Sequence, residues 1–275
     1  MSRPRASVVV PTRDRPDRLA RCLLALDAQT EPPAEVVVVD DGSRDPAAVL
    51  AAVGDRHRVR VVRAAGDGPA RARNLGAAEA AGDVVCFTDD DCRPGPGWIA
   101  ALVDAVAGGA EAVAGPTRNG RPDDAFATAS QLITNHLAER SRRSAAPFAP
   151  TSNLAVRAER FAALRFDESF PLAAGEDREW CDRLAAAGHH LVWAADAWVE
   201  HHQELSPRGF WDQQLRYGRG AAHLRRQGRH RLQAPAFYAG LLRRAAGEGP
   251  AVAALVVVAQ VATARGLTSE RRRLS

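Results

Sequence analysis

Residues 83–91, DVVCFTDDD, join a continuous run of apolar side chains to three consecutive aspartates. Three similar runs precede it: ASVVVP at 6–11, EVVVVDD at 35–41 and VRVVRA at 59–64. Continuous β-branched runs are typical of strands that are buried on both faces, and helix-like stretches between them indicate right-handed βαβ units. The sequence therefore predicts an α/β fold with a mostly parallel central sheet flanked by helices.

Two of the stretches between these runs have helical patterns. Residues 15–29, RPDRLARCLLALDAQ, repeat apolar side chains at helical spacing, which predicts one buried face. That face consists of Leu19, Cys22, Leu23 and Leu26. Residues 68–83, GPARARNLGAAEAAGD, have glycines near both ends, as is usual at helix boundaries. The alternation of strands and helices thus continues through the first half of the chain.

The composition limits both the size of the fold and its chemistry. With 275 residues, 46% of them hydrophobic and 25% charged, the chain is long enough for one large α/β domain or two small ones. It contains no lysine, which excludes P-loop proteins and Schiff-base or pyridoxal enzymes, because both need a lysine amine. Four cysteines are scattered and no secretory leader precedes the first run, so we expect reduced thiols and a cytoplasmic location.

The formal net charge of +4 conceals an uneven distribution, because arginines crowd residues 208–244. A basic flank predicts contact with phosphate groups or an anionic membrane surface, although a solvated helix face has the same composition. Residues 252–262, VAALVVVAQVA, form an apolar run that we expect to be too short to span a bilayer. A helix there either lies in an anionic interface or packs on the rest of the chain, and both alternatives stay open.

Polar side chains follow three of the four expected strands. PTRDR at 11–15 follows the first, Asp40 and Asp41 end the second, and the aspartates at 89–91 follow the fourth. Ligands of parallel α/β sheets bind beyond the carboxyl ends of the strands, so these groups are expected to converge. Three adjacent carboxylates repel one another unless water or a cation lies among them. An Asp-x-Asp spacing offers Mg²⁺ or Mn²⁺ the hard oxygen ligands that these ions prefer, which predicts a divalent cation beside substrate phosphates.

A dinucleotide-binding motif is the competing interpretation of this region. GPGWIA at 95–100 matches the G-x-G-x-x-A fingerprint. In that fingerprint the glycines follow the strand at once, and the helix amides meet the pyrophosphate. Here three carboxylates stand between strand and glycines and would repel a pyrophosphate, which argues against a dehydrogenase.

Six motifs occur in order along the chain: VVVPTRDRP, VVVVDDGSRD, GPARARNLGAAEAAGD, FTDDD, GEDREWCDRL and VEHH. Together they resemble glycosyltransferase family 2, the inverting nucleotide-sugar transferases with the A-type fold, over residues 6–220. The resemblance implies transfer of a sugar from a nucleoside-diphosphate sugar to an acceptor hydroxyl. It also implies a Mn²⁺ or Mg²⁺ cofactor, and it suggests cell-envelope polysaccharide as the context.

The resemblance further implies roles for individual residues. Asp177 in GEDREWCDRL takes the position of the general base, and Asp91 takes that of a metal ligand. His201 is the second expected ligand, with His202 as its alternative, at the end of an expected strand at 190–202. Nucleotide-sugar binding is expected from the following residues: Pro11, Thr12, Arg13, Asp41, Arg71, Asp89 and Asp90.

Residues 210–230 also read as a helix, with Arg216 and Arg219 on one face. Their closeness in sequence to the histidines leads us to expect both near the diphosphate, with Arg219 as the binding residue. The expected organisation is a catalytic domain followed by a basic helical segment. Its bounds are 1–205 for the domain, divided into a nucleotide-binding half at 1–116 and an acceptor half at 117–205, and 206–275 for the segment.

Several alternatives remain open at the level of the sequence. The expected donor is a UDP-sugar, with GDP- and dTDP-sugars as alternatives, and the acceptor is a glycan, a lipid-linked molecule or a small molecule, but no nucleic acid. Peripheral contact with the inner face of the cell membrane is an alternative to a purely cytoplasmic location. One alternative function is that of a nucleotidyltransferase of the same fold. Such enzymes normally carry a glycine-rich signature with a lysine after the first strand, where this chain has PTRDRP and no lysine. A non-catalytic nucleotide-sugar-binding protein would not need Asp177 as a base, and the acidic first turn of its helix would then serve the helix dipole.

Overall fold

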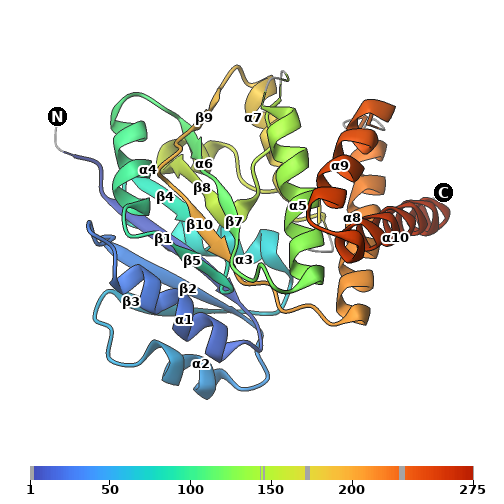
Figure 1. The fold of residues 1–275 in the computed structure, drawn as a ribbon. Coiled ribbons are helices and arrows are strands. Elements are labelled where there is room, and N and C mark those ends of the chain that lie inside the picture. Colours follow the sequence, from blue (N-terminus) through green and yellow to red (C-terminus); the bar gives the residue numbers. More distant parts are fainter. Residues whose placement is uncertain (1–2, 143, 145, 171–173, 229–232, 275) are drawn as a thin grey trace.

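Residues 3–142, 144, 146–170, 174–228 and 233–274 are described by a computed structural model in which helices flank a central sheet (Figure 1). The strands are β1 (Ala6–Thr12), β2 (Glu35–Asp41), β3 (Val59–Ala64), β4 (Val84–Phe87), β5 (Cys92–Pro94), β6 (Ala112–Ala114), β7 (Thr117–Asn119), β8 (Leu154–Arg157), β9 (Leu191–Trp193) and β10 (Val199–His201). The helices are α1 (Pro16–Asp27), α2 (Pro46–Val53), α3 (Pro69–Glu79), α4 (Trp98–Ala107), α5 (Ala125–Ser141), α6 (Ala158–Ala163), α7 (Glu176–Ala186), α8 (Pro207–Arg226), α9 (Pro235–Gly247) and α10 (Pro250–Leu274). The prediction of an α/β fold is confirmed.

The main sheet contains, within the described ranges, seven strands in the order β3-β2-β1-β4-β8-β6-β9. β1 pairs in parallel with β2 and β4, and β2 pairs in parallel with β3, so the four apolar runs form the expected parallel half. β8 runs antiparallel between β4 and β6. A second sheet, of order β5-β10-β7, begins directly after the aspartates that follow β4.

The prediction of a single strand at 190–202 is wrong, because two short strands, β9 and β10, occupy this stretch. β9 pairs with β6 in the main sheet, whereas β10 pairs with β5 and β7 in the small one. The backbone turns between them, where the Ala197 N–H donates to the Ala194 carbonyl oxygen at 3.2 Å. The change of sheet places His201 in register with Cys92, immediately after the three aspartates.

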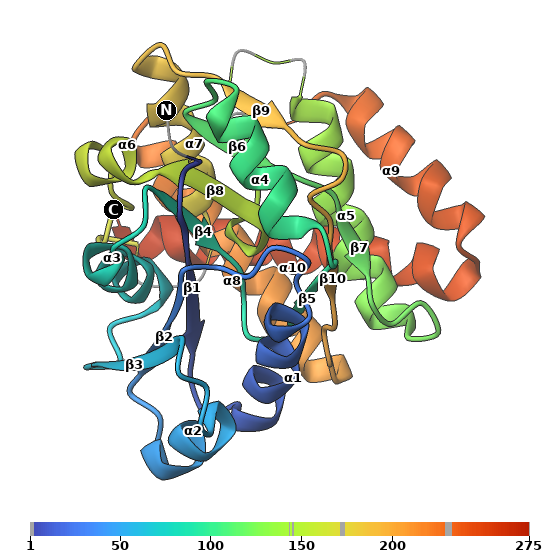
Figure 2. The same cartoon turned by 90° about the vertical axis from the view of Figure 1, so that its left-hand side faces the viewer.

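Alternate residues of the strands pack into separate cores on the two faces of the main sheet. Val8 and Val10 belong to a core with α1, α2 and α4, whereas Val9 belongs to a core with α3, α6 and α7. Figure 2 shows α3 and α6 on one side of β1 and α4 on the other. Burial on both faces is the reason that β1, β2 and β4 contain continuous apolar runs, whereas the partly buried edge strand β3 also contains Arg60 and Arg63. The predicted apolar face of α1 is buried as well.

The C-terminal helices α8, α9 and α10 form a third core together with α5 (Figure 1). α10 lies directly against α8, and glycines allow the two backbones to touch. A Cβ atom on Gly218 would lie 2.0 Å from the Thr263 carbonyl oxygen, and one on Gly266 would lie 2.1 Å from the Leu215 carbonyl oxygen. Of the two alternatives for residues 252–262, packing on the rest of the chain is therefore present.

The opposite face of α10 is apolar and exposed. Its side chains Val257, Val258 and Val261 are 51%, 39% and 56% exposed. The expectation that this segment is too short to span a bilayer is wrong, because the helix continues past the apolar run. By length and composition alone, Pro250–Arg271 would be able to cross a membrane. This is weak evidence for a membrane span, because a helix that packs against the rest of a protein can meet the same criteria.

Candidate active site

The three aspartates after β4 have different partners. Asp89 accepts a hydrogen bond from Arg73 Nη2 at 2.7 Å, and Asp90 accepts one from the Thr12 hydroxyl at 2.8 Å. Asp91 Oδ1 lies 3.2 Å from Nε2 of His201 on β10. Each carboxylate is thus compensated by its own donor or cation, which offsets the repulsion among the three.

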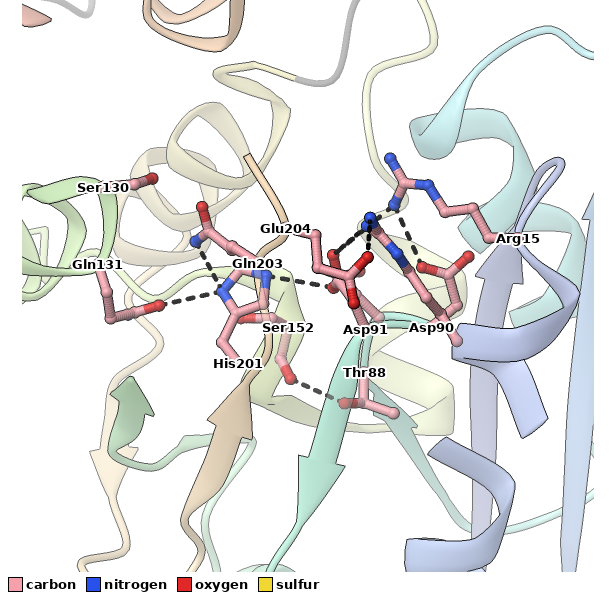
Figure 3. Close-up of polar contacts among 12 residues, drawn as sticks. Arg15, Thr88, Asp90, Asp91, Ser130, Gln131, Ser152, His201, Gln203 and Glu204 are labelled. Atoms are coloured by element: carbon pink, nitrogen blue, oxygen red, sulfur yellow. Dashed lines mark hydrogen bonds and ion pairs between the residues drawn. The ribbon is translucent and has the colours of Figure 1, made fainter. Parts of the chain in front are cut away.

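Asp90 and Asp91 have pKa values that are displaced in opposite directions. Burial and the charge of Asp91 raise the pKa of Asp90 to about 6. Burial opposes ionisation of Asp91 too, but cationic neighbours, His201 first, lower its pKa to about 2. Arg18 contributes through its Nη1 atom, 3.5 Å from Asp91 Oδ2. Arg15 Nη1 lies 3.7 Å from the same oxygen (Figure 3). Asp91 is therefore an anion at neutral pH.

Two side-chain amides orient His201. Its Nδ1 lies 3.0 Å from Gln131 Oε1 and 3.0 Å from Gln203 Nε2, which leaves Nε2 directed at Asp91 (Figure 3). Burial lowers the pKa of His201, but the adjacent Asp91 carboxylate outweighs it, and the pKa is raised overall. His202 turns away from the site, so His201 is the histidine that the fold brings to the aspartates.

Four potential ligand atoms lie within 4.8 Å of one another, and they come from Asp89, Asp91, Cys92 and His201. Two carboxylates and an imidazole form a donor set that fits Mn²⁺ or Mg²⁺. Cys92 does not fit this role, because burial raises the pKa of its thiol well above the ordinary value and keeps it neutral. The residues present would therefore hold a hard divalent cation through oxygen and nitrogen.

The two aspartates at the end of β2 differ in what remains free. Asp40 is fully engaged, since Ser43 N–H donates to Oδ1 at 2.8 Å and Arg63 pairs with Oδ2. Asp41 Oδ2 accepts from the Gly68 N–H at 3.1 Å, but its buried Oδ1 has no hydrogen-bond partner among the described residues. A buried acceptor without a partner is costly, so Asp41 is the residue prepared to accept a hydrogen bond from a ligand.

Arg73 on α3 joins the aspartates after β4 to α7. It donates through Nη2 to Asp89 and through Nη1 to Glu176 Oε1, the latter at 3.2 Å. The structure does not bring Arg71, the arginine expected to reach the donor, into this group: its side chain is 59% exposed and pairs with Asp67 at 3.0 Å. Side chains two residues apart on an α-helix point about 200° apart, so only one of the two arginines turns inward.

Asp177 lies in the first turn of α7. The helix begins after Gly175, whose φ of +96° is a left-handed conformation that glycine adopts without strain. Asp177 Oδ1 accepts the Arg178 N–H at 2.7 Å. Burial and the charge of Glu176 raise the pKa of Asp177 to about 7. Asp177 is therefore able to take up a proton near neutral pH.

On α8 the arginine that faces the site is Arg216. The structure does not bring Arg219 to the cavity, because its Nε lies 3.9 Å from Glu270 Oε2 of α10 and its side chain is directed into that helix contact. Arg216 lines the cavity together with Tyr217. The packing of α10 against α8 decides which of the two arginines is available.

One cavity of about 1140 Å³ is lined by most of the residues named above. The sequence-predicted residues in its wall are Pro11, Thr12, Arg13, Asp41, Asp89, Asp90, Asp91, Asp177 and His201. Arg71 and Arg219 are not among its lining residues, and Arg73 and Arg216 take their places. The fold thus brings together in one cavity the unpartnered acceptor of Asp41, a candidate cation site and a carboxyl with a raised pKa.

Two family profiles match this chain. That of Glycosyl transferase family 2 matches residues 7–168, and that of Glycosyl transferase family group 2 matches residues 100–265. The first match covers more than half of the chain. This chain belongs to glycosyl transferase family 2. Asp177 and His201 lie beyond the family 2 match but inside the second one.

Two named glycosyltransferases are similar in sequence to this chain. The chain is 29% identical over 202 residues to glycosyltransferase AglE of Haloferax volcanii, covering 70% of this chain and 65% of that protein. It is 30% identical over 228 residues to a pre-mycofactocin glycosyltransferase of Mycobacterium tuberculosis, covering 79% of this chain and 47% of that protein. The chain therefore spans less than two thirds of the length of either relative.

A solved structure supports the A-type fold of this family 2 chain. The mannosyltransferase PcManGT from Pyrobaculum calidifontis, in complex with GDP-Man and Mn²⁺, has a TM-score of 0.63 and 22% sequence identity. The match covers 99% of this chain and 84% of that one. At this identity the likeness shows a common fold.

The sequence interpretation missed Arg73, although a signal was present. Arg73 stands three residues after Ala70 and four before Ala77, and both alanines pack in the core beneath α3. A charged residue on the buried face of a helix needs a partner, so the spacing would have favoured Arg73 over Arg71. No comparable signal exists for Gln131, because its contact with His201 joins residues 70 positions apart.

Proposed function

We propose that this family 2 chain transfers a sugar from a nucleoside-diphosphate sugar to an acceptor hydroxyl, with inversion at the anomeric carbon. One observation carries the proposal: a carboxyl with a pKa of about 7 and a donor set for a divalent cation line the same cavity. The carboxyl suits proton uptake near neutral pH, and the donor set suits a diphosphate.

The end of the cavity near β1 and β2 would hold the nucleoside. The free Oδ1 of Asp41 would accept an N–H from the edge of a uracil, thymine or guanine base, which supplies its missing hydrogen bond. Pro11 near the end of β1 and Arg13 directly after that strand also line the cavity. UDP-, dTDP- and GDP-sugars all carry such an N–H. The mannosyltransferase of similar fold binds GDP-Man, so GDP-mannose belongs in the same screen.

Asp177 would act as the general base. Its Oδ1 is occupied by the Arg178 N–H, which leaves Oδ2 to receive the proton of the acceptor hydroxyl. The acceptor oxygen forms a bond to the anomeric carbon as the bond from that carbon to the diphosphate breaks, and the electron pair leaves with the diphosphate. Attack from the face opposite the leaving group inverts the configuration.

The diphosphate would lie near Asp89, Asp91 and His201, with Arg216 on α8 as an additional cation. When bound, Mn²⁺ or Mg²⁺ would neutralise the charge that develops on the leaving group. Arg73 holds Asp89 and Glu176 at the same time, so it keeps the donor side and the first turn of α7 in one arrangement. Arg73 is therefore a positioning residue in this proposal.

The test is a screen of UDP-, GDP- and dTDP-sugars with and without Mn²⁺. A donor present at one hundred times its Kd should stabilise the chain by about 2.7 kcal/mol and release nucleoside diphosphate when an acceptor is added. A nucleotidyltransferase would instead release pyrophosphate from a nucleoside triphosphate and a sugar phosphate. Metal-dependent binding without turnover under any acceptor condition would favour a non-catalytic binding protein.

We also propose peripheral contact of the outer face of α10 with an anionic bilayer. The apolar part of that face is Val257, Val258 and Val261, and exposed Arg265 and Arg271 follow on the same helix. Arginine beside exposed apolar side chains suits the boundary between lipid head groups and acyl chains. This surface complements a negatively charged membrane rather than a neutral one.

A further inference from the structure

The cavity is larger than a donor alone requires. Its volume of about 1140 Å³ exceeds the roughly 300–1,000 Å³ of most sites for one small molecule. The donor would occupy the part that the strand ends and the first turn of α7 form. The rest of the wall comes from α5, the loop that follows it, α8, α9 and α10, and it contains many more apolar side chains.

Apolar side chains of that second part line what we call the apolar compartment, and Thr134, Gln260 and Thr263 of the same helices line the cavity beside them. The apolar compartment is lined by Ile133, Leu137, Phe148, Leu224, Phe237 and Leu267. Ile133, Leu137 and Leu267 are only partly buried, although they lie where four helices converge. When an apolar ligand covers apolar side chains that face a cavity, apolar surface is removed from water, and this stabilises the complex.

Two helices, α5 and α8, extend from the candidate active site to this compartment. On α8, Arg216 and Tyr217 line the cavity first, and Leu224 lines it two turns later. At 1.5 Å per residue, the wall changes from polar to apolar over about 12 Å. α5 repeats this order, because Gln131 contacts His201 and Leu137 lies about 9 Å further along the helix axis.

We infer that the acceptor carries an alkyl or isoprenoid chain that lies in the apolar compartment, with its hydroxyl at Asp177. The inference rests on the proposed function, since it places the acceptor of that same reaction. The polar end of the cavity would bind the reacting group, and the chain would run along α5 and α8 toward α9 and α10. A soluble glycan without an apolar group would leave these side chains uncovered.

The first test measures binding of butyl, hexyl and octyl β-D-glucoside, each below its micelle concentration. These probes share one polar head and differ only in chain length. Binding should tighten by up to about fourfold per added methylene, which corresponds to about 0.8 kcal/mol per buried methylene. A Kd that stays constant from butyl to octyl glucoside overturns the inference.

Matched variants locate the chain. Leu137→Gln places an amide in the apolar compartment and should abolish the dependence on chain length, whereas Val257→Gln on the outer face of α10 should leave it intact. Ala221 on α8 also lines the cavity, and Ala221→Leu narrows it without adding polarity, so this variant should weaken octyl binding more than butyl binding. If Val257→Gln removes the dependence and Leu137→Gln keeps it, the chain binds to the outer face and the inference fails.

Nucleotide binding separates this inference from the proposed function. The parent and all three variants should bind the same nucleotide, UDP, GDP or dTDP, equally well with Mn²⁺, because none of the three substitutions changes Asp41 or the aspartates after β4. Failure of the parent to bind all three nucleotides would contradict the proposed function, whatever the glucosides show. Normal nucleotide binding with no dependence on chain length would overturn only the apolar acceptor.

Discussion

Replacement of Asp177 by asparagine tests the proposed mechanism most directly. The substitution keeps the size of the side chain and its hydrogen bond from the Arg178 N–H, but an amide cannot take the acceptor's proton. Transfer should fall by the roughly 10²–10⁴-fold that general-base catalysis contributes. Donor affinity should not change, because Asp41, Asp89 and Asp91 hold the nucleotide and the cation in our proposal.

The pKa of Asp177 also predicts how kcat of the parent changes with pH. With a pKa of about 7, Asp177 is ionised in about one tenth of the molecules at pH 6 and about nine tenths at pH 8. The parent's kcat should therefore rise about tenfold between pH 6 and pH 8, as the ionised fraction does. The residual activity of Asp177→Asn should stay flat across the same interval.

Stability supplies a control on the same variant. The folded-state pKa of Asp177 is raised above 3.8, so ionisation in the fold costs free energy, and this cost grows as the pH rises from about 4 to 7. Asparagine removes that cost, and its only expected loss is a helix-dipole contribution of about 0.3–1 kcal/mol. Asp177→Asn should therefore be at least as stable as the parent at pH 8.

The assay is transfer to an acceptor from the donor found in the screen, followed by NMR of the anomeric proton. Asp182→Asn on the same helix is the matched control and should transfer at the parent's rate. Near-normal transfer by Asp177→Asn, or a product that retains the donor's configuration, would refute the assignment and direct the same test to Glu176.

Three further predictions concern the cation site, the buried arginine and the outer face of α10. Asp91→Asn should fold but lose more than tenfold in Mn²⁺-dependent donor affinity, because an amide is a poorer ligand for a hard cation; an unchanged Mn²⁺ titration would contradict the metal assignment. Arg73→Met should lower the free energy of unfolding by about 3 kcal/mol by leaving two carboxylates without their cation, whereas Arg71→Met should cost less than about 0.5 kcal/mol, and equal losses in urea denaturation would contradict the geometry. The chain should float with liposomes that contain phosphatidylglycerol and not with neutral ones, and Val258→Glu should abolish flotation. If the parent chain stays at the bottom of the gradient with both kinds of liposome, the membrane proposal is refuted.

The parallel half of the fold was predictable because its signals are local. Continuous β-branched runs determine which residues form β1 to β4, and helical spacing determines the buried face of α1. Parallel strands end at one edge of a sheet, so the aspartates after β4 and Asp41 after β2 could be expected to converge before any contact was known. The motif order pointed to Asp177 and His201 because each stands at a fixed place in a short pattern, and both line the cavity; their roles remain predictions.

What the sequence left undecided depends on packing between distant segments. The choice between Arg71 and Arg73 is made by a contact between Arg73 and Glu176, which are 103 residues apart. The choice between Arg216 and Arg219 is made by α10, whose Glu270 engages Arg219. Local spacing states which residues share a face of one helix, but it does not state what that face meets. Only the tertiary structure, through close packing and the need to pair buried charges, decides which arginine enters the cavity and that four helices close its far end with apolar side chains.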